Sequence, residues 1–206
     1  TPAPPAVPSL SHGFRSRFGS PWYCTEIDDF CRCTPKTSHS APAHAPCLLY
    51  AYGGFEISQT PGYAATIGAG WLERGATYVV ANIRGGGEFG PTWHQAAKKE
   101  KRHVCVEDLA AVAEDLVKTG VAQHESLGIR GGSNGGLLVG NFYVQRPELV
   151  GAVVCAVPLL DMKRYSHLLA GASWRAEYGD PDVPEEWNYL KHNSAYHNID
   201  EKKAPF

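Results

Sequence analysis

The segment Ile129-Arg-Gly-Gly-Ser-Asn-Gly-Gly-Leu-Leu138 carries the most informative fold signal in this chain of 206 residues. It starts in the run Leu127–Arg130, whose length and apolar content favour a strand over a helix. It ends in a helical pattern expected from Ser133 to Gln145, which Pro147 would stop because proline lacks the N–H that a helix needs. Glycines flank the serine on both sides, as a sharp turn requires. G-x-S-x-G between a strand and a helix predicts a nucleophile elbow, a strained turn that presents a serine.

Such a turn would expose the Ser133 hydroxyl to a carbonyl carbon. The main-chain N–H of Asn134 would lie at the helix start, where it and the helix dipole can stabilise a developing oxyanion. The alternative is a glycine-rich turn in which Ser133 only caps the helix. The order of strand, turn and helix favours the nucleophile.

Three further apolar runs resemble buried parallel strands: residues 47–52, 77–83 and 151–157. Before the elbow, one apolar stripe recurs at helical spacing and ends at Gly120; it consists of Leu109, Val112, Ala113, Leu116 and Val117. Strands that alternate with helices predict an α/β domain with a parallel sheet and right-handed crossovers.

Residues 1–46 have a different composition, with prolines scattered among serine, threonine, histidine and alanine. Because proline fixes φ and removes a backbone donor, we expect neither a helix nor a central strand there. We interpret residues 1–46 as a poorly ordered leader, with a short ordered piece around residues 18–30. The predicted catalytic domain occupies residues 47–206.

The composition limits the classes of partner. With 43% hydrophobic and 19% charged residues and a net charge of −2, the chain is typical of a soluble globular domain or part of one. We expect no nucleic-acid partner because no basic excess is present, and no membrane partner because no apolar run reaches roughly 18 to 20 residues. Neither a metal nor a cofactor is expected, since Cys31-Arg-Cys33 lacks a second cysteine pair. Unpatterned cysteines and the lack of a secretory signal predict a cytoplasmic location.

Two other glycine clusters follow predicted strands, Tyr52-Gly-Gly-Phe55 and Arg84-Gly-Gly-Gly-Glu-Phe-Gly90. Parallel strands end at one edge of a sheet, so both clusters would share a rim with Ser133. Neither contains a phosphate-binding signature, and nucleotide binding is therefore not predicted.

Taken together, the motifs resemble, in order and spacing, the catalytic domain of the prolyl oligopeptidase family of serine peptidases. They are residues 50–55, 82–90, 131–138, Gln145-Arg-Pro147 and Trp174-Arg-Ala-Glu-Tyr-Gly179, and the resemblance covers about residues 47–199. It implies an α/β-hydrolase fold, a mostly parallel sheet with helices on both faces.

The resemblance also implies roles for single residues. Ser133 matches the acylating nucleophile, while the Tyr52 hydroxyl and the Asn134 main-chain N–H match the oxyanion hole. Trp174 matches the indole that stacks on the substrate proline, and Phe55 and Tyr178 match other walls of that pocket. Flat aromatic surfaces suit a rigid pyrrolidine ring. For each aromatic residue the alternative is simple burial in the core.

In the resembled family the triad aspartate and histidine follow later strands, and nothing after Asn198 is similar to those segments. We therefore expect a C-terminally truncated domain, with both residues beyond the chain end and a nearly inactive 206-residue chain. His192 and His197 are expected at the surface. The start at Thr1 suggests that the natural start is missing as well.

The implied activity is hydrolysis of short peptides on the carboxyl side of proline, through an acyl-enzyme on Ser133. The full-length form is expected to be a monomer. Two alternatives stay open: an esterase or acylase on the same fold, and a catalytically dead hydrolase fragment that acts as a binding protein.

Overall fold

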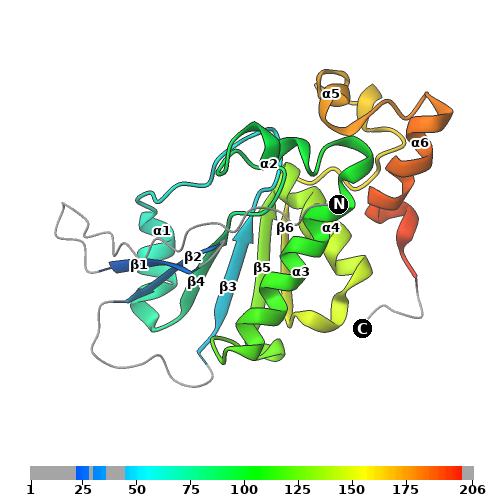
Figure 1. The fold of residues 1–206 in the computed structure, drawn as a ribbon. Coiled ribbons are helices and arrows are strands. Elements are labelled where there is room, and N and C mark those ends of the chain that lie inside the picture. Colours follow the sequence, from blue (N-terminus) through cyan, green and yellow to red (C-terminus); the bar gives the residue numbers. More distant parts are fainter. Residues whose placement is uncertain (1–21, 28–29, 36–44, 201–206) are drawn as a thin grey trace, which may run out of the picture.

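The computed structural model describes the backbone of residues 22–27 and 30–35 and the whole of residues 45–200. A six-stranded sheet runs through it in the order β1-β2-β4-β3-β5-β6 (Figure 1). The strands are β1 Trp22–Ile27, β2 Phe30–Pro35, β3 Cys47–Ala51, β4 Thr77–Ala81, β5 Leu127–Gly132 and β6 Ala152–Ala156.

The four strands predicted from apolar runs are parallel. β3 lies between β4 and β5 and is parallel to both, and β6 is parallel to β5. This confirms the expected α/β class with a mainly parallel sheet. The segments that follow β3, β4 and β5, which carry Tyr52, Arg84 and Ser133, therefore leave the sheet at the same edge.

Helices connect the strands. The α-helices are α1 Ala65–Gly70, α2 Pro91–Gln95, α3 His103–Lys118, α4 Asn134–Gln145, α5 Arg175–Tyr178 and α6 Pro184–Leu190. The 3-10 helices are η1 Leu72–Arg74, η2 Lys99–Lys101, η3 His124–Ser126, η4 Pro147–Leu149, η5 Tyr165–His167, η6 Gly171–Trp174, η7 Lys191–Asn193 and η8 Ala195–Asn198. The chain crosses the sheet in opposite directions through α1 and α3, so right-handed crossovers place these two helices on opposite faces.

The main core lies between the sheet and the helices α3 and α4. Leu49, Val79, Ile129 and Phe142 are wholly buried in it, and Leu109 contributes from the predicted apolar stripe of α3. Burial of one such side chain stabilises a fold by about 1.5–3 kcal/mol. This core holds the strand ends, and hence the loops that follow them, in fixed relative positions.

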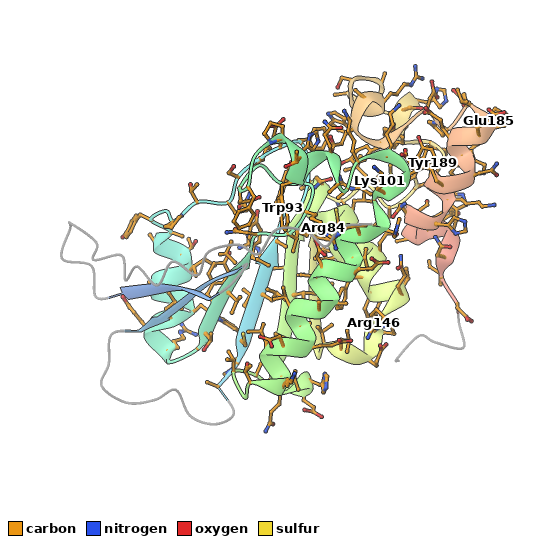
Figure 2. All side chains as sticks on the ribbon, in the orientation of Figure 1. Arg84, Trp93, Lys101, Arg146, Glu185 and Tyr189 are labelled. Atoms are coloured by element: carbon orange, nitrogen blue, oxygen red, sulfur yellow. The ribbon has the colours of Figure 1, made fainter. Side chains whose placement is uncertain are left out.

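A second cluster lies at the carboxyl edge of the sheet, under the segment that contains α5 and α6 (orange to red in Figure 1). Its buried members are Leu137, Met162, Tyr165, Tyr178 and Leu190. Partly buried hydrophobic side chains surround them: Phe55, Leu159, Trp174, Trp187 and Tyr189, the last of which is labelled in Figure 2. We call these ten residues the aromatic cluster.

The N-terminal segment differs from the expected leader. β1 and β2 form an antiparallel hairpin, and β2 continues the sheet by pairing with β4, so that it is an interior strand. The expectation of no central strand in residues 1–46 is therefore wrong for Phe30–Pro35. Pro21 precedes the hairpin and Pro35 ends it, so the prolines flank the strands and do not interrupt them. The remaining residues up to 44 lie outside the described residues.

The fourth predicted strand is less buried than expected. β6 forms the edge of the sheet, and its residues Ala152, Val154 and Cys155 are exposed. An apolar run alone does not distinguish an edge strand from a central one, because the place of a strand in the sheet depends on pairing with segments that are distant in the sequence.

Candidate active site

Ser133 occupies a strained turn between β5 and α4. Its φ of 57° and ψ of −116° lie outside the usual regions for an L-residue, a conformation that costs of order 1–3 kcal/mol. The Ser133 N–H donates to the carbonyl of Ala156 on β6 over 3.0 Å, which anchors the turn to the sheet. The Ser133 side chain makes no capping hydrogen bond to the helix. The geometry therefore confirms the sharp strand-to-helix turn and does not support the alternative in which Ser133 is only a cap.

The glycines around Ser133 are required by close backbone contacts. A Cβ atom on Gly131 would lie 2.0 Å from the carbonyl oxygen of Gly135, and one on Gly136 would lie 2.7 Å from that of Ala156. Real Cβ atoms do not approach backbone oxygen so closely. The turn can close only because these positions lack side chains.

Tyr52 follows β3 directly and reaches the same turn. Burial, and secondarily the neighbouring Tyr50, raise the pKa of the Tyr52 phenol, while a hydrogen bond with the Ser133 side chain acts in the opposite direction. The phenol therefore keeps its proton at neutral pH. A Cβ atom on Gly135 would lie 3.7 Å from Cδ2 of Tyr52, so the ring lies against the nucleophile turn. The structure thus brings Tyr52, which the family resemblance matched to the oxyanion hole, to the same turn as Ser133.

Asn134 contributes more than its main chain. Its side chain is wholly buried; Nδ2 donates to the carbonyl of Tyr52 over 2.6 Å, and Oδ1 accepts from the Tyr178 hydroxyl over 2.8 Å. Oδ1 also accepts a short hydrogen bond from Nη2 of Arg102. Gly54 passes so close that a Cβ there would lie 2.4 Å from Nδ2. The Asn134 amide therefore joins the elbow, the loop after β3 and helix α5.

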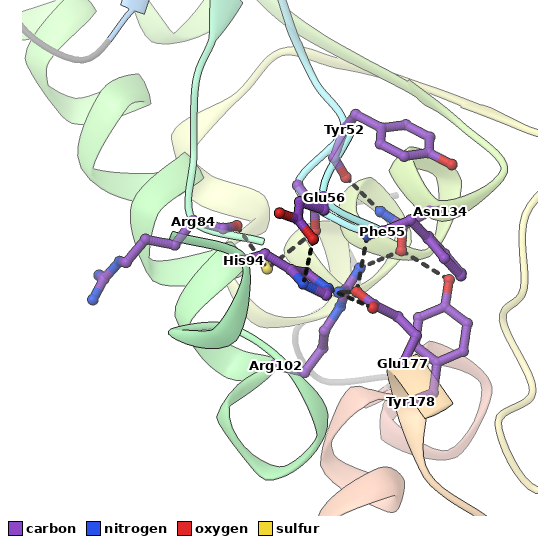
Figure 3. Close-up of polar contacts among 11 residues, drawn as sticks. Tyr52, Phe55, Glu56, Arg84, His94, Arg102, Asn134, Glu177 and Tyr178 are labelled. Atoms are coloured by element: carbon purple, nitrogen blue, oxygen red, sulfur yellow. Dashed lines mark hydrogen bonds and ion pairs between the residues drawn. The ribbon is translucent and has the colours of Figure 1, made fainter. Parts of the chain in front are cut away.

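A buried ionic network lies next to these residues and was missed by sequence reasoning (Figure 3). Oε1 of Glu177 accepts from the main-chain N–H of Phe55 over 3.0 Å and from Nη1 of Arg102 over 2.9 Å. Oε2 of Glu177 lies 2.7 Å from Nε2 of His94. Glu177 stands within the quoted motif at residues 174–179, but no spacing in the sequence links it to Arg102 or His94.

Arg102 is the cation of this network. Burial lowers the pKa of its guanidinium, but Cys105, Tyr178 and Glu177 outweigh that effect, and the net shift is upward. The guanidinium carbon lies 5.2 Å from the centre of the Tyr178 ring, within the range of a cation–π contact. Arg102 is therefore a fixed positive charge under the elbow.

The three aromatic residues predicted from the resemblance gather in the aromatic cluster. Phe55 and Tyr178 meet edge to face, with ring centres 5.5 Å apart. Tyr178 is buried and, through its hydroxyl, is tied to Asn134, whereas Trp174 and Phe55 are half-buried. An apolar, partly accessible aromatic surface thus lies close to the nucleophile turn.

The loop after β4 is clamped against the same region. The Arg84 guanidinium pairs with the Asp108 carboxylate, and the Arg84 main-chain N–H donates to Oδ2 of Asp108 over 3.0 Å. The buried thiol of Cys105 donates to the carbonyl oxygens of Gly53 and Arg84, at 3.4 and 3.2 Å. These contacts tie α3 to both glycine-rich loops.

Within residues 45–200, the histidine side chains with a polar contact have partners other than Ser133. The partners are Glu177 for His94, the Glu100 carbonyl for His103, the Leu149 carbonyl for His124, Asp182 for His167 and Ser194 for His197. His192 and His197 are exposed, as expected. Neither a triad histidine nor its aspartate partner is therefore assigned among the described residues.

Other features of the described residues are limited. No group of three or more His, Cys, Asp or Glu side chains in that part of the chain is arranged to hold a metal ion. Its cysteines Cys47, Cys105 and Cys155 are not in disulfides; the side chains of Cys24, Cys31 and Cys33 lie outside it. None of its helices has the length and apolar content needed to cross a membrane.

Comparison with known proteins identifies relatives. A family model described as the prolyl oligopeptidase family matches residues 65–206. An uncharacterized peptidase of Sinorhizobium fredii is 54% identical over 154 residues, which are 75% of this chain and 21% of that protein. A prolyl endopeptidase of Elizabethkingia miricola is 43% identical over 155 residues, 75% of this chain and 22% of that protein.

Solved structures agree with these relatives. A post-proline cleaving enzyme from Rickettsia typhi superposes with a TM-score of 0.78 at 44% identity, over 83% of this chain and 25% of that one. Prolyl oligopeptidase B from Galerina marginata gives a TM-score of 0.78 at 33% identity, over 91% of this chain and 26% of that one. The chain thus spans about a fifth to a quarter of the length of these proteins.

Proposed function

The chain belongs to the prolyl oligopeptidase family, and we propose that it carries the nucleophile, the oxyanion donors and the proline pocket of a serine peptidase. The substrates are short peptides, cleaved on the carboxyl side of proline. The observation that carries the proposal is the turn at Ser133, which is strained, does not serve as a side-chain cap and lies against the Tyr52 ring. Strain of this kind persists where the surroundings hold it and is common at active sites.

In the proposed reaction, Oγ of Ser133 attacks the carbonyl carbon of the prolyl residue, and its proton passes to a general base. The oxyanion of the tetrahedral intermediate accepts hydrogen bonds from the Tyr52 hydroxyl and the Asn134 main-chain N–H. The intermediate collapses to an acyl-enzyme as the C–N bond breaks and the amine leaves with the proton. Water then hydrolyses the ester, which releases the proline-terminated peptide and restores Ser133.

The general base and its acidic partner are assigned to the longer protein, as the family resemblance implies. An imidazole is needed because a serine hydroxyl is a weak nucleophile at its ordinary pKa. The described residues supply the remaining parts: an attacking oxygen, two donors for the oxyanion and an apolar wall.

Proline selectivity is assigned to Trp174, Phe55 and Tyr178 within the aromatic cluster. Trp174 and Phe55 are half-buried, and Phe55 is fixed edge to face on Tyr178. A pyrrolidine ring stacked on the indole would gain apolar contact without loss of rotamer freedom, because the ring is already rigid. A more flexible side chain would lose that freedom on binding.

The test uses this chain within its complete open reading frame. Active protein should react at Ser133 with a fluorophosphonate probe and hydrolyse a chromogenic prolyl amide, and Ser133→Ala should abolish both signals. A matched peptide with alanine in place of proline measures selectivity. Faster turnover of a simple aryl ester, with no preference for proline, would overturn the peptidase assignment in favour of an esterase. Failure of Ser133 to react would instead leave a hydrolase-like binding protein.

A further inference from the structure

We propose that Glu177 is a positioning residue that links the shape of the proline pocket to the position of the oxyanion donor Tyr52. This inference rests on the proposed function and extends it to a residue outside the reacting groups. The carboxylate of Glu177 lies between the loop that carries Phe55 and the side chain of Arg102 (Figure 3).

The first half of the link concerns the pocket wall. Phe55 has a φ of 56° and Glu56 a φ of 57°, left-handed values that non-glycine residues rarely adopt. The Phe55 N–H donates to Oε1 of Glu177 across 122 positions of sequence. This bond holds the strained backbone of Phe55, and with it the ring that meets Tyr178.

The second half reaches the oxyanion hole. The same Oε1 atom accepts from Nη1 of Arg102, whose Nη2 donates to Oδ1 of Asn134. Nδ2 of Asn134 donates to the main-chain carbonyl of Tyr52. Four consecutive contacts thus connect the backbone of Phe55 in the pocket wall with the backbone of Tyr52, the proposed oxyanion donor.

A role in stability alone does not account for this arrangement well. The side chains of Arg102 and Glu177 are only 7% and 5% exposed, and a buried ion pair often stabilises a fold less than apolar residues of the same volume would. Here all the charged groups have directional partners: Glu177 has Phe55, Arg102 and His94, and Arg102 has Glu177 and Asn134. These hydrogen bonds fix the positions of the groups that they join, whereas apolar packing alone would fix them less tightly.

The experiment is a double-mutant cycle between Glu177→Gln and Tyr52→Phe in the complete protein, with active sites counted by fluorophosphonate titration. Glutamine keeps the shape and one acceptor oxygen but loses the charge that orients Arg102. Because small displacements of a catalytic donor are costly, Glu177→Gln should lower kcat for the prolyl amide about 10- to 100-fold, with a smaller change in KM. In the Tyr52→Phe background the same substitution should lower kcat less than about 3-fold, since two mutations that act through one group are not additive.

The matched control is Glu186→Gln on α6. Glu186 pairs with Lys99, and it also accepts from the Asp180 N–H, but it contacts none of Phe55, Arg102 and Asn134. It should leave kcat per titrated site unchanged. If Glu177→Gln does not fold, the double variant Arg102→Met with Glu177→Gln takes its place. This variant removes both partners of the ion pair and so leaves neither charge buried alone, and it should show the same loss of kcat.

Two results would overturn the inference while the peptidase assignment stands. One is a normal kcat per titrated site in the Glu177 variant. The other is an equal loss in the wild-type and Tyr52→Phe backgrounds, which would show that Glu177 does not act through Tyr52. A wild-type protein that labels at Ser133 but shows no prolyl hydrolysis would overturn the proposed function and this inference together.

Discussion

The side-chain amide of Asn134 donates a hydrogen bond to the main-chain carbonyl of Tyr52 over 2.6 Å, across 82 positions of sequence. This contact fixes the loop after β3 to the first residue of α4. The main chain of Tyr52 and the turn that carries Ser133 are thereby joined directly, which favours a preorganised position of the phenol. Preorganised donors of this kind need no rearrangement during reaction.

Tyr52→Phe tests the phenol as an oxyanion donor. We expect kcat for a prolyl amide to fall about 10²- to 10³-fold, as for the loss of one donor in other oxyanion holes, with little change in KM. The melting temperature should change little, because the side chain is only half-buried. An unaltered kcat would remove Tyr52 from the oxyanion hole.

Trp174→Ala tests the wall of the proline pocket. The ratio of kcat/KM for the prolyl peptide to that for its alanine analogue should fall about 10- to 100-fold, because an apolar stacking surface is lost. Trp187→Ala is the control: this indole belongs to the same aromatic cluster but contacts Lys163 and His197. It should lower stability without a loss of selectivity, and an equal loss of selectivity in both variants would argue against a specific role for Trp174.

Gly131→Ala tests whether the nucleophile turn has room for a side chain at position 131. The new Cβ would lie 2.0 Å from the Gly135 carbonyl oxygen, and backbone atoms cannot rotate away, so we expect destabilisation of at least about 1–3 kcal/mol. Gly70→Ala, at the end of α1, has no atom within 4 Å of the new Cβ and should be neutral or stabilise by up to about 1 kcal/mol. Urea unfolding of both variants measures the difference.

Alkaline pH should weaken the fold through the half-buried Tyr78. Burial, with a smaller effect of Tyr50, raises the pKa of Tyr78 from 10.0 to about 12. Because the folded state holds this proton more tightly, the contribution of Tyr78 to stability is complete below pH 10 and is lost as the pH rises toward 12. Urea unfolding across this range should show a falling free energy, with a shallower fall for Tyr78→Phe. Tyr63→Phe, at a site that is 92% exposed, should retain the wild-type slope.

The exposed edge strand β6 predicts self-association of the isolated 206-residue chain. Val154 is 50% exposed on the last strand of the sheet, and unprotected apolar edges pair with other chains. Val154→Lys should reduce the light scattering of concentrated samples. Val183→Lys replaces a valine that is 40% exposed but lies outside the strands, and it should have a smaller effect. Equal scattering by the wild-type chain and the Val154 variant would contradict this role of the edge.

Much of the fold follows from interactions between residues close in sequence. The glycine pattern around Ser133 predicts the turn, because only residues without a Cβ fit there, and the stripe that includes Leu109 and Leu116 predicts the buried face of α3. Alternation of strands and helices predicts the parallel sheet. These signals were sufficient to predict that Tyr52 and Ser133 lie at the same edge of the sheet.

Contacts between distant segments could not be predicted in this way. In the ionic network, Arg102 and Glu177 are 75 positions apart, and Phe55 and Glu177 are 122 positions apart. The sequence does not identify which distant residue a charged side chain will contact. The pairing of β2 with β4 and the exposure of β6 were missed for the same reason. Local sterics and periodicity determine turns and helices, but burial and ion pairing arise only when the complete backbone places distant residues within reach of one another.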